Sequence, residues 1–234
     1  MRDAAVIFDV DGVLLDLTPP EEDAFFHPFL ALHGLTGLSR DWDNYRIRND
    51  HDIMAEVLER HFGHPPTEEE MDHLKQSYLS HLDAGLSQGA LTAVEIPGAR
   101  DLLNALREDG VVIGIATANL IDAARLRLAS AGLWDFVAEL PFGADGGGAK
   151  AEILARAIAA SGLPKHRIVF LGDNLNDVDA GLRNEVHFIG FAQDQARRDK
   201  LAGAGAATVS GDHDTSYQLI SRMLGRTNLK AGTR

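Results

Sequence analysis

The sequence predicts an α/β protein with a doubly wound parallel sheet and an inserted, all-helical second unit. Two observations lead to this prediction. Short runs rich in Val and Ile, without polar alternation, are typical of strands that are buried on both faces of a parallel sheet. From residue 95 onward such runs alternate with amphipathic stretches, whereas residues 17–94 show helical periodicity and no strand-like run. A doubly wound sheet places its ligands beyond the carboxyl ends of its strands.

The elements follow in order from these patterns. The expected core comprises residues 1–16 and 95–234, and the expected helical cap comprises residues 17–94. Within the cap, Thr67 and Glu70 form a capping-box pattern at the start of the third helical stretch. The polar, basic end of the chain, residues 226–234, is expected to fray. The expected strands are 4–8, 111–117, 136–140, 167–173 and 186–191, and the expected helices include 21–34, 52–63, 67–85, 119–132, 151–162 and 177–184.

Composition excludes some classes of function. The chain has 234 residues and a formal net charge of −13, which argues against non-specific binding to nucleic acid. It contains no cysteine, so disulfides and thiolate chemistry are excluded. No apolar run is long enough for a membrane span, and no secretory signal is visible. We therefore expect a soluble, cytoplasmic protein without a nucleic-acid or membrane partner, as a monomer or a homodimer.

Pairs of carboxylates follow two of the expected strands. Asp9 and Asp11 come directly after residues 4–8, and Asp173 and Asp177 follow residues 167–172. Alone, Asp9 and Asp11 fit a solvated turn as well as a functional site, and Asp173 and Asp177 also fit a turn or a helix N-cap. In a doubly wound sheet, however, the carboxyl ends of parallel strands share one edge, so Asp9, Asp11 and Asp173 are expected to converge. An all-oxygen cluster of this kind suits Mg²⁺.

Two further features lie at the same predicted edge. Thr117 ends a strand with Asn119 close behind it, which fits either a phosphate site or a simple helix cap. Lys150 begins an amphipathic helix, where a cation is unfavourably placed in the helix dipole. A compensating anion is therefore expected beside Lys150, either a phosphate group or Asp177.

Together these motifs resemble those of the haloacid dehalogenase superfamily. "DVDGVLLD", "ATAN", "GAK" and "GDNLND" occur in the family's order and at strand ends. The resemblance extends over almost the whole chain, including "IPGARDLLNALREDGVVIGIATAN" and "VFLGDNLNDVDAGLRN". Within the superfamily, the chain is similar to the phosphoglycolate-phosphatase-like branch, which has a Rossmann-like core and an inserted helical cap.

The resemblance implies a Mg²⁺-dependent phosphatase that hydrolyses a small phosphorylated metabolite. It implies that Asp9 is the nucleophile and becomes an aspartyl-phosphate, and that Asp11 acts as general acid and then general base. The remaining implied roles are metal binding by Asp9, Asp173 and the backbone carbonyl of Asp11, phosphate binding by Thr117, Lys150 and more weakly Asn119, and orientation of Lys150 or a metal-bound water by Asp177.

The sequence departs from the family pattern at two places. Ala151 stands where proline usually follows the family's lysine, and the segment "LTPPEEDAFF" is a few residues longer than is common. The second departure affects the alignment of the cap hinge. The core motifs are unaffected by either change.

Other functions share some of these motifs. A phosphomutase of the β-phosphoglucomutase type uses all four, but Glu21 lies near the position where its cap histidine is expected. A dehalogenase lacks the second aspartate, and a phosphonate hydrolase needs a cap lysine, for which only Lys75 is available. Bacterial receiver domains also use a phosphorylated Asp with Mg²⁺, but they are about half this length and carry that residue on a later strand.

The cap offers candidates for substrate specificity. Arg46 and Arg48, in "YRIRNDHD", are either contacts for a second anionic group of the substrate or surface salt-bridge partners. The cap histidines fit no zinc-binding spacing and are better explained as exposed or packing residues. They are His27, His33, His51, His61, His64, His73 and His81.

Overall fold

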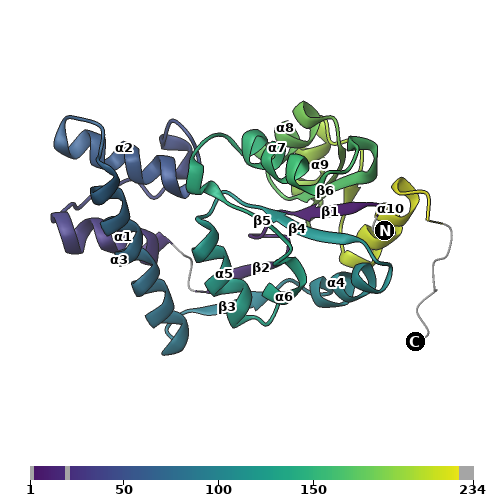
Figure 1. The fold of residues 1–234 in the computed structure, drawn as a ribbon, viewed down its shortest axis with the longest axis horizontal. Helices are drawn as coiled ribbons and strands as arrows, with labels where there is room; N and C mark the ends of the chain where they lie inside the picture. Colours follow the sequence, from purple (N-terminus) through teal and green to yellow (C-terminus); the bar gives the residue numbers. More distant parts are fainter. Residues whose placement is uncertain (1–2, 19–21, 227–234) are drawn as a thin grey trace.

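The computed structural model describes residues 3–18 and 22–226 and shows two units joined by a short waist (Figure 1). Within these residues, six parallel strands form one sheet in the larger unit. β1 lies near its centre, between β4 and β6, and its residues are completely buried. In spatial order the strands are β5 (Leu140–Phe142), β4 (Val112–Ala116), β1 (Ala5–Phe8), β6 (Ile168–Gly172), β7 (His187–Phe191) and β8 (Val209–Ser210).

Helices cover both faces of this sheet. Val6 and Phe8 of β1 belong to the apolar cluster on one face, while Ala5 and Ile7 belong to the cluster on the other. This division follows from the alternation of side chains along a strand, and it explains why β1 carries no polar residue. The first face is covered by α4 (Ala99–Glu108), α5 (Ile121–Ser130), α6 (Trp134–Val137) and α10 (His213–Met223), and the second by α7 (Lys150–Ser161), α8 (Leu175–Asn184) and α9 (Gln195–Gly203).

Three short 3₁₀ helices lie in the connections between successive helices and strands of the two units. They are η1 (Trp42–Asn44), η2 (Ala144–Gly146) and η3 (Lys165–Arg167).

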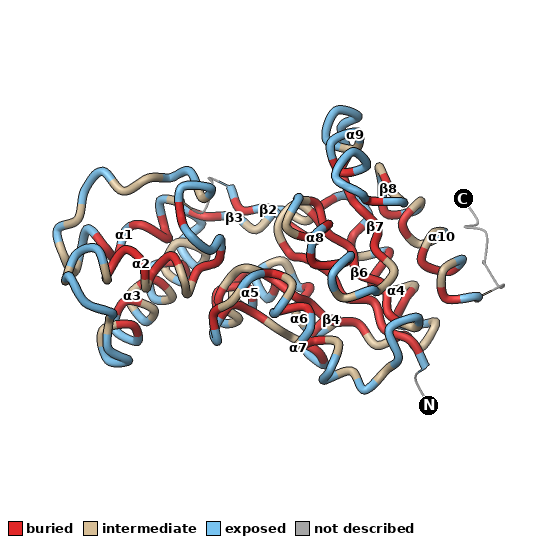
Figure 2. The backbone as a smooth tube through the Cα atoms, turned by 90° about the horizontal axis from the view of Figure 1, so that it is seen from above, coloured by how far each residue is buried: buried red, intermediate tan, exposed pale blue. Residues whose placement is uncertain are grey.

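The smaller unit is formed by α1 (Glu22–His33), α2 (Asp50–Phe62) and α3 (Glu68–Ser87), which pack around their own apolar cluster (Figure 2). The predicted capping box at the start of α3 is present, with Thr67 and Glu70 bonded to each other's backbone. Leu120 and Ala123 of the larger unit also belong to this cluster. The aromatic residues of "AFFHPFL" and "WDNY" pack in or against it.

Two predictions about strands are wrong. Residues 136–137 lie in α6 and the strand follows at Leu140–Phe142, because Leu133 and Val137, four residues apart, are both buried on one side of a helical turn. The waist, expected to be non-strand, contains β2 (Leu15–Thr18) paired antiparallel with β3 (Thr92–Glu95). β2 alternates buried and exposed residues and no residue of β3 is buried, so neither strand has the continuous apolar run from which the other strands were predicted.

Candidate active site

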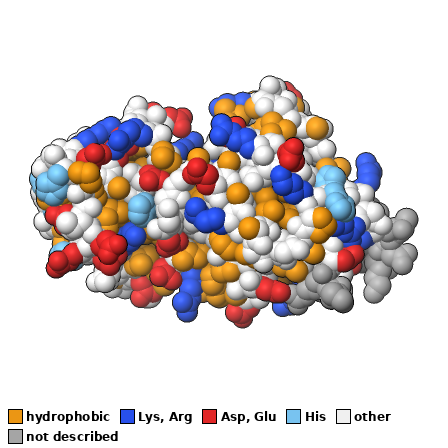
Figure 3. Space-filling model, turned by 45° about the horizontal axis from the view of Figure 1, so that its top comes forward, with side chains coloured by type: hydrophobic (Ala, Val, Ile, Leu, Met, Phe, Trp, Pro, Cys, Tyr) orange, Lys and Arg blue, Asp and Glu red, His pale blue; other side chains and the backbone are white. Residues whose placement is uncertain are grey.

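A cavity of about 790 Å³ lies where the two units meet, over the carboxyl ends of β1, β4 and β6. A hollow between the two lobes is visible in the space-filling view, with acidic and basic side chains near it (Figure 3). Its size is in the range of small-molecule sites. The charged residues lining it are Asp9, Asp11, Asp16, Glu22, Arg48, Asp50, Lys150, Asp173, Asp194 and Arg197.

Lys150 lies between two carboxylates at the floor of the cavity. Its Nζ is 2.7 Å from Asp9 Oδ2 and 2.8 Å from Asp177 Oδ1. Both Lys150 and Asp177 are buried, so each needs the other's charge. These carboxylates are the compensating anions expected for a lysine at the start of a helix, and they hold the pKa of Lys150 above its usual value although burial alone would lower it.

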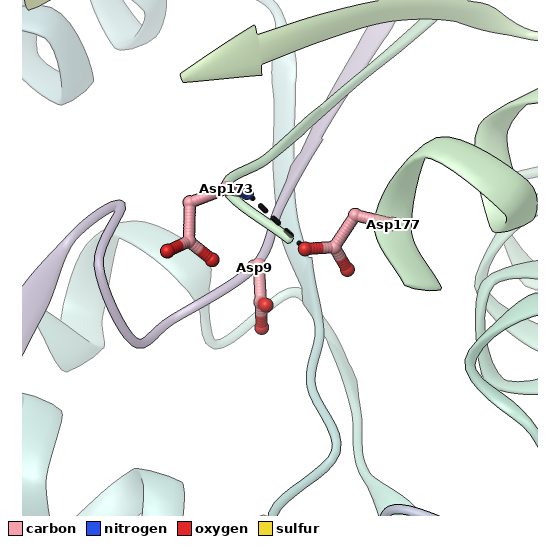
Figure 4. Close-up of side chains that lie close together, drawn as sticks. All are labelled: Asp9, Asp173 and Asp177. Atoms are coloured by element: carbon pink, nitrogen blue, oxygen red, sulfur yellow. Dashed lines mark hydrogen bonds between the residues drawn. The ribbon is translucent and has the colours of Figure 1, made fainter. Parts of the chain in front are cut away.

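Asp9, Asp173 and Asp177 form a compact cluster of carboxylates (Figure 4). One oxygen from each lies within 4.8 Å of the others. Asp177 is already engaged, since its Oδ2 accepts hydrogen bonds from the backbone N–H groups of Asp173 and Asn174 at 3.2 and 3.0 Å. Asp177 is also completely buried, whereas Asp9 and Asp173 line the cavity, so these two are better placed to bind a cation.

Two glycines allow the carboxylates to approach one another. A Cβ on Gly12, whose φ is +71°, would lie 2.3 Å from Asp173 Oδ2. A Cβ on Gly172 would lie 2.3 Å from the Cβ of Asp177. The Asp-Gly and Gly-Asp pairs of the first and fourth motifs are thus required by the close packing of this cluster.

The electrostatics of the cluster fit a divalent cation. Burial raises the pKa of Asp9 to about 6, with Lys150 acting in the opposite direction and Asp177 adding to the increase. Burial also raises the pKa of Asp173 to about 7, with further increases from Asp9 and Asp177. Crowded carboxylates that resist ionisation are stabilised in their charged form by a bound cation, and oxygen ligands suit Mg²⁺.

Thr117 and Asn119 follow β4, the neighbour of β1 in the sheet. The Thr117 hydroxyl donates a hydrogen bond to Asn119 Oδ1 at 2.9 Å and accepts one from the Asn119 N–H at 3.2 Å. Both residues line the cavity together with Lys150. The structure therefore brings together the three residues that the sequence predicts for phosphate binding.

Asp11 faces a residue that the sequence analysis missed. Its carboxylate accepts hydrogen bonds from the guanidinium of Arg127, which also donates to Asn119 Oδ1. The available signal was a charged residue on an apolar helix face. Arg127 shares the buried side of α5 with Ala123, Ala124 and Leu128.

Arg197 of α9 is a second residue that the analysis missed. Its guanidinium forms an ion pair with Asp173 Oδ2, and its Nε donates to the Asp173 carbonyl at 3.1 Å. It lies outside the four motifs, so only the fold places it here. The Arg197 side chain is half-exposed, whereas that of Asp173 is mostly buried.

The start of α2 contacts both loops that carry the phosphate-binding candidates. Leu120 N–H donates to Asp50 Oδ2 at 2.8 Å, and the Asp50 N–H donates to the Ala118 carbonyl at 2.9 Å. On the other loop, the Asn49 side-chain amide donates to the Gly148 carbonyl and the Gly148 N–H donates to Asp52 Oδ2, each at 2.8 Å. These polar residues were hidden in the sequence because Asn49 also fits an ordinary N-cap, which it is.

The two arginines proposed for specificity differ in position. Arg48 lines the cavity and forms an ion pair with Asp43 at 3.2 Å. Arg46 pairs with Glu56 and Glu59 and is not among the described residues that line the cavity.

The cap histidines lie outside the carboxylate cluster described above. Among the described residues, the only group of His, Cys, Asp and Glu side chains with metal-binding geometry is that of Asp9, Asp173 and Asp177, so no such group includes a cap histidine.

Two further predictions fall outside the described part of the chain. They concern Glu21, which lies near the position expected for a mutase histidine, and residues 227–234 of the tail. In that described part, no helix is both long and apolar enough to cross a bilayer.

Comparison with known proteins gives consistent matches. The family model for haloacid dehalogenase-like hydrolases matches residues 4–184. The chain is 28% identical over 187 residues to an N-acetylmuramic acid 6-phosphate phosphatase from Pseudomonas aeruginosa, covering 77% of this chain and 78% of the relative. It is 30% identical over 190 residues to a phosphoglycolate phosphatase from Caulobacter vibrioides, covering 79% and 76%. A putative β-phosphoglucomutase from Bacteroides vulgatus has a similar fold, with a TM-score of 0.67 and 21% identity over 95% of this chain and 90% of that one.

Proposed function

This chain belongs to the haloacid dehalogenase-like hydrolases, and on that premise we propose that it is a Mg²⁺-dependent phosphatase acting through an aspartyl-phosphate. The observation that carries the proposal is the arrangement of Asp9, Lys150 and Asp173 at one end of the sheet. A nucleophilic carboxylate, a cation for the phosphoryl oxygens and a second carboxylate for a metal ion lie together there.

In the first half-reaction, Asp9 attacks the phosphorus atom and the bond to the leaving oxygen breaks. Asp11 donates a proton to that oxygen, so an alcohol departs. Lys150, Thr117 and Asn119 bind the phosphoryl oxygens, whose charge is spread in the transition state. Asp177 keeps Lys150 in place through its ion pair.

In the second half-reaction, Asp11 accepts a proton from a water molecule that attacks the aspartyl-phosphate. Inorganic phosphate leaves and the Asp9 carboxylate is restored. Asp9, Asp173 and the Asp11 carbonyl would hold Mg²⁺, which would reduce the repulsion between the Asp9 carboxylate and the phosphate dianion.

We propose that the helical unit, residues 17–94, is a cap that contributes specificity through Arg48. The compounds named for the two relatives, N-acetylmuramic acid 6-phosphate and phosphoglycolate, are both phosphate monoesters that also carry a carboxylate. A guanidinium in the cavity wall suits such a second anion. We therefore expect the substrate to be a small phosphate monoester with an additional acidic group.

The test is a screen for phosphate release over phosphorylated sugars, sugar acids, hydroxy acids and nucleotides, with MgCl₂ and with EDTA. Release that requires Mg²⁺ and is lost in Asp9→Asn would support the proposal. Full activity of Asp9→Asn, or no hydrolysis of any ester, would contradict it. Phosphoryl transfer between sugar phosphates without net release would instead identify a phosphomutase.

A further inference from the structure

Arg127 occupies a costly position for a cation. Its side chain is completely buried, on a helix face otherwise formed by Ala123, Ala124 and Leu128. A buried guanidinium is tolerated only when its charge and N–H groups are matched by partners. The position therefore suggests a requirement beyond packing, because an apolar side chain would complete this face of α5.

Two of the partners of Arg127 are site residues from different motifs. Its Nη1 is 2.7 Å from Asp11 Oδ1, and its Nη2 is 3.3 Å from Asp11 Oδ2 and also donates to Asn119 Oδ1. Asn119 Oδ1 in turn accepts the Thr117 hydroxyl. One buried cation thus links the loop after β1 to the loop after β4.

Asp11 lines the cavity and remains accessible, with 43% of its side chain exposed, whereas Arg127 is not among the described residues of the cavity wall. The planar fork of a guanidinium fixes the plane of a carboxylate that it binds at both oxygens. Each carboxylate oxygen keeps a second acceptor site, so the accessible side of Asp11 is still able to exchange a proton.

We infer that Arg127 is a positioning residue, which holds the Asp11 carboxylate in the orientation needed for proton transfer and aligns it with Asn119. The inference rests on the proposed function, since it assumes that Asp11 is the general acid and base. It assigns a role to a residue outside the four motifs.

The experiment uses the full chain with Arg127→Met, Arg127→Lys, Asp11→Asn and the Arg127→Met/Asp11→Asn double variant. The substrates are p-nitrophenyl phosphate and the best alkyl phosphate from the screen. Arg127→Met should lower kcat for the alkyl ester by about tenfold to a hundredfold with little change in KM, which corresponds to losing charge-assisted hydrogen bonds. The loss should be smaller for p-nitrophenyl phosphate, because its leaving group needs less help from an acid.

Two further outcomes separate positioning from structural support. In the Asp11→Asn background, Arg127→Met should cause a much smaller loss of activity than in the wild type, because most of its effect acts through Asp11. Arg127→Lys, which keeps one cation, should recover part of kcat. Thermal unfolding of each protein shows whether it is folded. If Arg127→Met is not, the same comparisons are made with Arg127→Lys.

Equal losses of kcat on both esters, or losses that multiply in the double variant, would overturn the inference. The proposed function would still stand, because the wild-type chain would be an active phosphatase. A wild-type chain that hydrolyses no ester would overturn both. These failures are therefore distinguishable.

Discussion

The two units of the molecule carry their charges in opposite ways. At the sheet edge, Lys150, Asp177 and Arg127 are buried, and each contacts more than one charged or polar group of the site. In the cap, some arginine pairs lie on the surface, as in Arg46 with Glu59 and Arg48 with Asp43, although the Glu56 carboxylate that Arg46 and Arg60 share is buried. Buried pairs are fixed in one arrangement, whereas exposed pairs exchange partners readily. The core is thus suited to constant chemistry and the cap to adaptable recognition.

The largest expected difference between the units comes from breaking one ion pair in each. Asp177→Asn leaves Lys150 buried with one carboxylate fewer, so we expect a loss of about 3 kcal/mol in the free energy of unfolding. Glu59→Gln, the matched change in the cap, should cost less than about 1 kcal/mol. Urea unfolding of the three proteins measures both losses. Similar losses would contradict the contrast between buried and exposed charges.

A second prediction concerns Mg²⁺ and pH in the core. The pKa values of Asp9 and Asp173 are raised to about 6 and about 7, so the folded protein binds more protons than the unfolded chain between pH 4 and 7. The stability contributed by these groups is present at low pH and is lost as pH rises through those values. A cation that binds the ionised carboxylates of Asp9 and Asp173 should restore this stability.

The unfolding midpoint should therefore rise little with MgCl₂ at pH 5, and by about 3 °C or more at pH 8 when Mg²⁺ is at tenfold its dissociation constant. Calorimetry with MgCl₂ and with EDTA at the two pH values provides the measurement. Asp173→Asn is the control and should abolish the shift. An equal shift at both pH values would argue against ionised Asp9 and Asp173 as the binding groups.

A third prediction uses the two neighbouring arginines of the cap. Arg48→Ala should raise KM for the acidic phosphate ester about five- to tenfold, the effect of losing one charge-assisted hydrogen bond, with little effect on p-nitrophenyl phosphate. Arg46→Ala is the matched control, since Arg46 pairs with Glu56 and Glu59 instead of lining the cavity. Steady-state kinetics on both esters tests this. If Arg48→Ala weakens both esters equally, Arg48 does not set specificity.

The sequence could predict the site residues that belong to local motifs, but not those that reach the site from elsewhere in the fold. Asp9, Asp173, Thr117 and Lys150 were identifiable because parallel strands bring their carboxyl ends to one edge, so local motifs imply a common location. Arg127 and Arg197 reach the same place from helices α5 and α9, and no local pattern marks that convergence. The short strands β2 and β3 were missed because neither has the continuous buried apolar run that marks the strands of the main sheet.

The smallest expected effect is the pH response of two cap histidines, and its sign is opposite to that of Asp9 and Asp173. Burial and the nearby His61 and His73 lower the pKa of His33, while burial and His27 lower that of His81, whose ring is stacked on His27 with centroids 3.9 Å apart. Such groups contribute stability above the ordinary value of 6.5, and the contribution is lost as pH falls through the lowered pKa. Acid therefore weakens these histidine contacts in the pH range in which it stabilises the metal-free carboxylates.

Replacing both residues in a His33→Gln/His81→Gln variant should isolate the cap's share of this response. The two rings are largely solvated, so screening keeps the effect on the order of 1 °C. In EDTA, the difference in unfolding midpoint between variant and wild type should shift in favour of the variant as pH falls from 7 to 5.5. A difference that stays constant with pH would show that these histidines titrate alike in the folded and unfolded chain. His33 and His81 would then contribute nothing to the acid response of the protein.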